Sequence, residues 1–375
     1  MRINSIELFH VAIPRATSSA TGSASATAVG PLETVLVRMQ SGSTVGWGEA
    51  SPGNGPHTSG EWAGGVFATL RRWLVPALVG RDVASAEQLR EYLAPFKGNP
   101  FAKSALDTAW WDLAARLRGE PLHRMLDGVR ETVELGVTLD PMDSLEAFLA
   151  RAQRAADDGF SRIAMTFRPG WEISVLSALR DRLPLTPLHV DCGGTMRLEH
   201  METLCRLDDF SLSMVAQPLA ADDLVGHAMI QEAIHTPICL DESITSLEQA
   251  DMAMELKSCQ YVDLKPGRVG GLTPALAIHD LCREACVPCW VGAMPQTAIA
   301  ARAGLALAAK ENCTYPADHS PANEWFERDL APPVETTLLN GRRVAPLWTE
   351  PGIGVEPDAE LLEKCTLDRA AVGLS

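Results

Sequence analysis

Three charged residues lie on a regular interval of the chain that could bring them into one site. At intervals of about 25 residues the chain carries Thr166, Asp191, Ala216, Asp241 and Lys265. A carboxylate can accept a proton and an ammonium can donate one, so Asp191, Asp241 and Lys265 together suit acid–base chemistry. The interval matches one strand followed by one helix, which predicts that these positions end neighbouring parallel strands.

Lys265 is the most informative of these residues because lysine is scarce in this chain. Of the 32 Lys+Arg residues, only six are lysines. Lys265 lies between Leu264 and Pro266 at the expected end of a strand, where a solvated surface charge is hard to explain. A structural salt bridge to Asp241 on the neighbouring strand is the alternative to a proton-transfer role. Asp263 lies two residues earlier and is expected to face the same side, where it could also pair with Lys265.

The elements that must position these residues form a repeating pattern from Val133 onward. Short β-rich runs are each followed by a stretch of helical length, which predicts a parallel sheet, and seven or eight such units predict a closed barrel. The runs are VELGVTL, SRIAMTF, PLHVD, LSMVAQPL, PICLDES, YVDLKPG and PCWVGAM, with a weaker eighth near residues 313–319. Barrels of this kind carry their active sites at the C-terminal ends of the strands.

The first third of the chain follows a different pattern. Residues 1–50 alternate as antiparallel strands do, and residues 60–119 are helical in period, so together they predict a small α+β unit. Residues 15–30 are rich in Ser, Ala, Thr and Gly and are either a flexible connection or an active-site lid. We therefore expect an α/β protein with a capping domain at residues 1–125, a modified (β/α) barrel at 126–322, and a segment at 323–375 that completes the cap.

Composition excludes several classes of protein. The 375 residues carry a net charge of −16, which argues against nucleic acid or an anionic membrane as a partner. The sequence contains no run of 18 apolar residues, so we expect no transmembrane helix. The first residues also lack the pattern of a signal peptide. We expect a cytoplasmic protein that acts on a small molecule.

The nine cysteines all follow residue 190, and three of them need weighing as an iron–sulfur motif. Cys282, Cys286 and Cys289 have the C-x3-C-x2-C spacing of such a site. The first two, however, lie one turn apart on an expected helix, and the third opens an expected strand. We therefore expect reduced and mostly buried thiols.

Several motifs resemble the enolase superfamily, in particular its o-succinylbenzoate synthase and N-acylamino acid racemase branch within the muconate lactonizing enzyme subgroup. They are WGEASP at 47–52, AWWDL, LDES at 240–243, DLKPGRVGG at 263–271 and the closing PGIGVE. The resemblance covers nearly the whole chain. It implies a modified TIM barrel, an α+β cap built from both chain ends, and a homo-oligomer.

The resemblance also implies a chemistry, namely abstraction of a proton next to a carboxylate. In that family Mg²⁺ is held by three carboxylates on the third, fourth and fifth strands and stabilises the enolate. Lysines on the second and sixth strands act as base and acid. Asp191 matches the first metal ligand, Asp241 the third, and Lys265 the sixth-strand lysine.

The chain departs from that family at several of these positions. The Lys-x-Lys motif of the second strand falls on residues 164–166, Ala-Met-Thr, and the middle metal ligand falls on Ala216. Gln296 stands where a carboxylate is common, and Gly193 where a polar side chain is usual. Glu242 is expected to alternate to the other face of its strand. Mg²⁺ binding is therefore expected to be weak or absent, through Asp191 and Asp241 if at all.

Three hypotheses follow from this pattern. The first is a divergent enzyme without a cofactor, in which Lys265, Asp191 and Asp241 carry out cyclisation, elimination or isomerisation of a small organic acid or acylated amino acid. The second is a non-catalytic binding protein on the same fold. The third is a residual metal-dependent activity of the racemase or o-succinylbenzoate synthase type. The residues expected to contact substrate are Thr166, Asp263, Gln296, His57 and Trp62.

Overall fold

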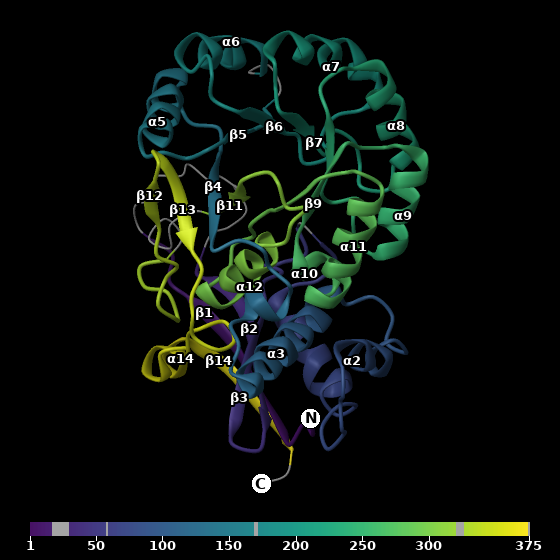
Figure 1. The fold of residues 1–375 in the computed structure, drawn as a ribbon, viewed down its shortest axis with the longest axis vertical. Coiled ribbons are helices and arrows are strands. Elements are labelled where there is room, and N and C mark those ends of the chain that lie inside the picture. Colours follow the sequence, from purple (N-terminus) through teal and green to yellow (C-terminus); the bar gives the residue numbers. More distant parts are fainter. Residues whose placement is uncertain (17–29, 58, 169–171, 320–325, 374–375) are drawn as a thin grey trace.

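A four-stranded antiparallel sheet forms the base of the molecule. The computed structural model describes residues 1–16, 30–57, 59–168, 172–319 and 326–373, so residues 17–29 of the expected lid lie outside the described residues. The sheet comprises β1 (Ser5–Ile13), β2 (Leu32–Ser41), β3 (Thr44–Ala50) and β14 (Thr366–Gly373), in the order β14-β1-β2-β3. Both chain ends lie at this end of the molecule (Figure 1).

The cap helices follow this sheet, and the longest of them packs on it. They are α1 (Ala63–Thr69), a π-helical turn (Leu70–Leu74), α2 (Ala86–Leu93), α3 (Pro100–Arg118) and α4 (Leu122–Met125). A proline opens α3, and Gly119, with φ of 72°, ends it. Gly46 and Gly48 of β3 lie so close to α3 that any Cβ there would overlap the backbone of Ala109 and Ala105. These glycines therefore set the distance between the sheet and α3.

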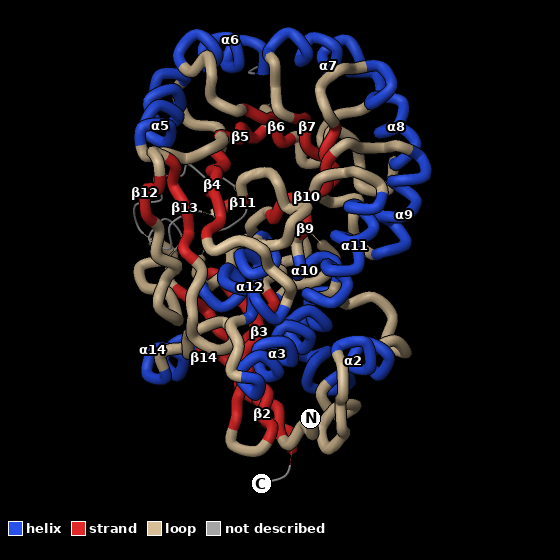
Figure 2. Tube along the Cα trace, viewed as in Figure 1, coloured by secondary structure: helices blue, strands red, loops and turns tan. Residues whose placement is uncertain are grey.

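Eight parallel strands form the barrel, and helices surround them (Figure 2). The strands are β4 (Thr132–Leu139), β5 (Ile163–Thr166), β6 (Leu188–Asp191), β7 (Met214–Ala216), β8 (Ile238–Leu240), β9 (Tyr261–Leu264), β10 (Cys289–Val291) and β11 (Ala317–Asp318). Neighbours pair in chain order from β4 to β10. β11 pairs with β4, and an isolated bridge joins Cys289 of β10 to Cys313, which lies just before β11 in the chain. The expected α/β barrel with a cap is confirmed.

The barrel helices alternate with these strands as the repeat predicts. They are α5 (Leu145–Asp157), α6 (Glu172–Arg182), α7 (Met201–Leu207), α8 (Leu224–Ala233), α9 (Leu247–Leu256), α10 (Pro266–Val269), α11 (Leu272–Glu284) and α12 (Ala298–Ala308), with 3-10 turns at Leu198–His200 and Asp208–Phe210. Ser144 and Ser246 cap the N-termini of α5 and α9 through their side-chain oxygens.

The C-terminal segment divides between the two parts of the molecule. β12 (Thr337–Leu339) and β13 (Arg342–Pro346) form a hairpin, and β13 pairs with the first half of β4. α14 (Ala359–Cys365) and β14 return to the cap, where β14 pairs with β1. The hairpin joins the barrel because β11 is only two residues long and covers β4 only at Leu135 and Gly136. Residues 1–125, 126–322 and 323–375 remain a proposed division.

Buried carboxylates join the cap to the barrel at the N-terminus of α12. Glu49 at the end of β3 accepts hydrogen bonds from the backbone N–H of Thr297 (3.0 Å) and Ala300 (3.1 Å). Asp329 accepts from the N–H of Ala298 (3.0 Å). Two carboxylates thus satisfy the free N–H groups at the positive end of one helix dipole.

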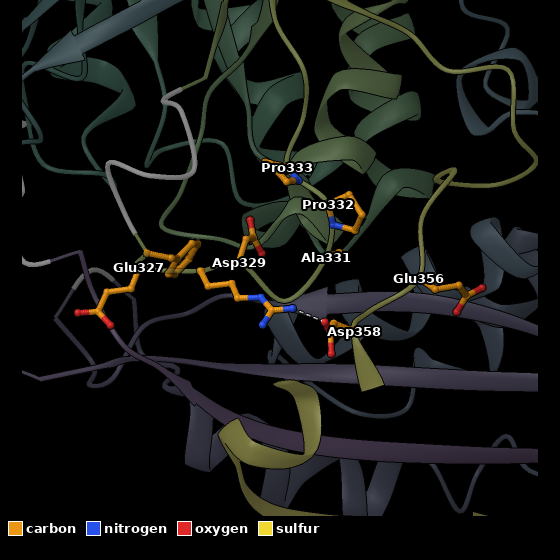
Figure 3. Close-up of a pocket in the computed structure, with 9 residues that line it drawn as sticks. Glu327, Asp329, Ala331, Pro332, Pro333, Glu356 and Asp358 are labelled. Carbon is orange, nitrogen blue, oxygen red and sulfur yellow. Dashed lines mark hydrogen bonds and ion pairs between the residues drawn. The ribbon is translucent and has the colours of Figure 1, made fainter. Parts of the chain in front are cut away.

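Asp329 also borders a cavity of about 480 Å³ that residues of the C-terminal segment line (Figure 3). Its Oδ1 atom is buried and has no hydrogen-bond partner. Burial, together with the nearby charge of Glu49, raises the pKa of Asp329 to about 7. The folded protein therefore holds a proton here that the unfolded chain, with an aspartate pKa of about 3.9, releases.

Stability should consequently fall as the pH rises from about 4 to about 7, because deprotonation favours the unfolded state over this range. Asp329→Asn keeps an acceptor for the Ala298 N–H but removes the charge, so between pH 5 and pH 8 it should gain unfolding free energy relative to native, on the order of 1–2 kcal/mol. Urea unfolding at pH 5, 6, 7 and 8 measures this. Asp358→Asn in the same cavity, where Asp358 pairs with exposed Arg328, is the matched control. Parallel pH curves for native and Asp329→Asn would show that Asp329 does not titrate in this range.

Candidate functional site

Four neighbouring strands bring the sequence-predicted residues to one face of the barrel. β6 ends at Asp191 and β7 at Ala216, and the register places these two residues side by side. Asp241 follows β8 and Lys265 follows β9 directly. All four positions therefore lie at the C-terminal ends of parallel strands, where barrels of this kind carry their sites.

Lys265 lies at the centre of an ion-pair network. Its Nζ donates to Asp241 Oδ2 at 2.7 Å and lies 3.3 Å from Asp263 Oδ2. Asp263 also accepts from the N–H of Gly292 at 2.6 Å. Burial alone would lower the pKa of Lys265, but the charges of Asp263, Glu242 and Asp191 more than offset this and raise it. The salt bridge to Asp241 is present, and the ammonium is held in its charged form.

Arg268 is a second cation in this network, and the sequence analysis did not assign it a role. It lies on α10, the short helix that begins after Lys265, and its Nη1 binds Asp241 Oδ1. Both oxygens of Asp241 are therefore occupied, one by each cation. Burial lowers the pKa of Arg268 to about 10, with Asp191 opposing the shift, so the guanidinium remains charged at neutral pH.

Glu242 lies toward the site, contrary to the expectation that it would face away. Its Oε1 is 3.7 Å from Arg268 Nη2, and its Oε2 is buried without a hydrogen-bond partner. Burial raises the pKa of Glu242, while Lys265 opposes the shift. The expectation was wrong because β8 ends at Leu240, so the alternation of a strand does not extend to residue 242.

Asp191 contributes a carboxylate that is only half-buried. Its Oδ1 accepts from the N–H of Gly193 at 3.0 Å, and Gly193 has φ of 50°, which glycine adopts without strain. Burial raises the pKa of Asp191, and the charge of Lys265 opposes this. Among the described residues, Lys265 and Arg268 bind the two oxygens of Asp241, whereas the Asp191 carboxylate accepts from the backbone N–H of Gly193.

The remaining predicted contact residues lie outside the Lys265 network. Thr166 donates to Asp140 Oδ1 at 2.9 Å, at the ends of β5 and β4. Gln296 lines a cavity of about 30 Å³ between cap and barrel that also borders Lys265. His57 and Trp62 are exposed in the cap, and among the described residues no hydrogen bond or ion pair joins either to Lys265.

The cysteines form neither disulfides nor a cluster site. All nine are free, and Cys282 and Cys289 are buried while Cys286 is exposed. Across the described residues no group of three or more His, Cys, Asp or Glu side chains could hold a metal ion. Seven of the nine cysteines are buried, as the expectation of mostly buried thiols requires.

The position of Lys265 depends on a glycine directly after the next strand, β10. A Cβ at residue 292 would clash with the Asp263 carboxylate and lie 2.6 Å from Lys265 Cε. Gly292→Ala should therefore displace this pair and cost on the order of 1–3 kcal/mol of unfolding free energy. Gly304→Ala on α12 is the control, because its Cβ would lie 3.5 Å from Val291, an ordinary contact. Urea unfolding should show a loss for the first variant and no loss for the second; equal effects would mean that Gly292 is not a close-packed position.

Comparisons with known proteins agree with this geometry. Residues 6–127 match the N-terminal domain of the mandelate racemase / muconate lactonizing enzyme family, and residues 147–361 match the enolase C-terminal domain-like family. An o-succinylbenzoate synthase of Bacillus subtilis is 36% identical over 332 residues, 88% of each chain. An N-succinylamino acid racemase of Thermus thermophilus is 37% identical over 333 residues, 89% of each chain.

Solved structures extend the likeness to the whole fold. A member of the enolase superfamily from Listeria innocua superposes with a TM-score of 0.93 at 27% identity and covers 100% of both chains. The L-Ala-D/L-Glu epimerase of Bacillus subtilis superposes with a TM-score of 0.85 at 27% identity, covering 96% of this chain and 100% of that one. In the described part of this chain, no helix is long and apolar enough to cross a membrane. The chain belongs to the enolase superfamily, with the N- and C-terminal domains of its mandelate racemase / muconate lactonizing enzyme group.

Proposed function

We propose that this protein is a divergent enolase-superfamily isomerase or lyase that moves a proton on one face of a small organic acid or acylated amino acid. The observation that carries the proposal is the Lys265 ammonium, held at the strand ends by Asp241 and Asp263. The names of its relatives, o-succinylbenzoate synthase and N-succinylamino acid racemase, support the substrate class.

The second-strand positions at which the family carries its other base hold no basic side chain in this chain. Ala164 of β5 is buried and has no polar side chain, and the Thr166 hydroxyl is engaged by Asp140. A racemase that exchanges a proton on both faces needs a base on each, so this arrangement favours cyclisation, elimination or one-sided isomerisation. In this proposal Lys265 donates a proton or anchors an oxyanion, and Asp191 accepts the proton.

The Mg²⁺ that the family implies does not fit the side chains as they lie. Mg²⁺ requires near-octahedral oxygen ligation. Ala216 offers no side-chain oxygen between Asp191 and Asp241, and both oxygens of Asp241 are engaged by Lys265 and Arg268. We therefore propose that the metal binds weakly or not at all, and we assign it no step.

Metal affinity tests this directly. Ala216→Glu should raise Mn²⁺ affinity by at least about tenfold, since even outer-shell partners of a metal contribute 10–100-fold. Electron paramagnetic resonance of free Mn²⁺ during titration measures it. Ala220→Glu, which adds the same carboxylate at an exposed position of the following loop, is the control. Native protein that retains stoichiometric Mg²⁺ after extensive dialysis against chelator would contradict weak binding.

Proton transfer can be detected without knowing the substrate in advance. The protein is incubated in D₂O with N-succinyl and other N-acyl amino acids and with small hydroxy acids, and ¹H NMR follows loss of the C–H signal next to the carboxylate and the appearance of alkene signals. Lys265→Ala should lower the rate by at least roughly 100-fold. Exposed Lys364→Met serves as the control for loss of a lysine.

Two further variants separate the roles of Lys265. Lys265→Arg keeps the positive charge but is a poor proton donor, whereas Lys265→Met keeps only the length. Activity in Lys265→Arg but not in Lys265→Met would assign an electrostatic role. Unchanged turnover in both would rule out Lys265 as the proton-handling group.

A second candidate function is a non-catalytic binding protein. It is favoured by Thr166, which stands where the family has a lysine base, and by Ala216, which stands where the family has a metal ligand. Binding of an acid from the same panel without any exchange would support it. Exchange that depends on Mg²⁺ and yields both enantiomers would instead support a residual metal-dependent racemase. We also propose a homo-oligomer, which rests on the family resemblance and is tested by analytical ultracentrifugation.

A further inference from the structure

Gln217 is a fully buried polar residue at the end of β7 with an unusual backbone conformation. Its side chain has no exposed surface, and its φ is 41°. Residues other than glycine rarely adopt positive φ, because the Cβ atom then crowds the backbone. Such a conformation persists only where surrounding bonds enforce it.

Three hydrogen bonds of the Gln217 side chain go to one turn, at residues 241–243. Its Oε1 accepts from the backbone N–H of Asp241 (2.9 Å) and of Ser243 (3.2 Å). Its Nε2 donates to Ser243 Oγ (2.7 Å) and to the carbonyl oxygen of Leu219 (3.0 Å). Gln217 thus holds the turn at residues 241–243, which carries Asp241 and Glu242.

The backbone of Gln217 forms hydrogen bonds to β8 on one side and to the turn after β6 on the other. Its N–H donates to the carbonyl of Cys239 in β8 at 2.8 Å, and its carbonyl accepts from the N–H of Gly194 at 2.7 Å. Gly194 follows the Asp191 turn. One residue therefore links the two strand ends that carry Asp191 and Asp241, across the position of Ala216.

We propose that Gln217 is a positioning residue that sets where Asp241 lies and so holds the Lys265 ammonium in place. The chain of contacts is short: Gln217 Oε1 binds the Asp241 N–H, and Asp241 Oδ2 binds Lys265 Nζ at 2.7 Å. Gln217 itself is fully enclosed and does not reach the substrate side. Its effect on turnover rests on the proposed function, but its effect on the geometry of Lys265 does not.

The test reads the environment of Lys265 without a substrate. Native protein and variants are treated briefly with formaldehyde and cyanoborohydride, and peptide mass spectrometry gives the methylation of Lys265 relative to the other five lysines. Gln217→Met has the same length but no acceptor for the Asp241 and Ser243 N–H groups. It should raise relative methylation of Lys265 by roughly tenfold, because the turn and its carboxylate move away.

Matched variants separate positioning from general stability. Ser243→Ala removes one partner of Gln217 but leaves the acceptor of the Asp241 N–H. The relative methylation of Lys265 should therefore stay within about threefold of its native value. Gln217→Glu keeps an oxygen that accepts from the Asp241 N–H, so the relative methylation of Lys265 should again stay within about threefold of native. It is the conservative substitution at this position. Gln217→Asn, shorter by one methylene, withdraws the amide and replaces Gln217→Met if that variant does not fold.

The outcomes are distinct. A lower unfolding midpoint in Gln217→Met with native protection of Lys265 would overturn the proposal, because the role would then be structural only. Exposure of Lys265 in Ser243→Ala equal to that in Gln217→Met would overturn it as well. If the proton-exchange assay finds a substrate, kcat of Gln217→Met should fall roughly tenfold or more, with KM within about threefold. Absence of any exchange would count against the proposed function and would leave the methylation result unaffected.

Discussion

The charge of Lys265 imposes the constraint on which the C-terminal face of the barrel depends. An ammonium buried among parallel strands costs several kcal/mol unless carboxylates match it and their own oxygens are satisfied. Asp241 meets it from the neighbouring strand and Asp263 from its own, and the Gly292 N–H satisfies the second oxygen of Asp263. Three consecutive strands of the barrel are thereby set relative to one another at one end, around a group that can hold a proton.

The same principle joins the cap to the barrel. Buried carboxylates of the cap reach the N-termini of barrel helices, where free N–H groups and the helix dipole favour negative charge. Glu49 does this for α12, and Asp107 does it for α11 by accepting from the N–H of Thr273 at 3.0 Å. These links hold the cap over the strand ends and enclose the small cavity that Gln296 and Lys265 share.

The parts of the candidate site that could be predicted are those on regular elements. The pairing of Lys265 with Asp241 follows from the strand interval, and that with Asp263 from alternation within one strand. The residues that were missed lie just beyond a strand. Glu242 follows the end of β8, Gln217 has positive φ after β7, and Arg268 lies on a four-residue helix. Their side-chain directions depend on local turns, for which no periodic rule holds.

The sequence by itself determined the order of strands and helices, the barrel and the presence of a cap, because hydrophobic periodicity reports which face of each element is buried. It also placed Asp191, Asp241 and Lys265 at strand ends, since the βα repeat has a constant length. Only the tertiary structure decided that β13 pairs with β4, and that Arg268 and Lys265 divide the two oxygens of Asp241. Those contacts join residues whose separation in the chain carries no period, so they are set by which backbone edges and charges remain unpaired once the barrel has closed.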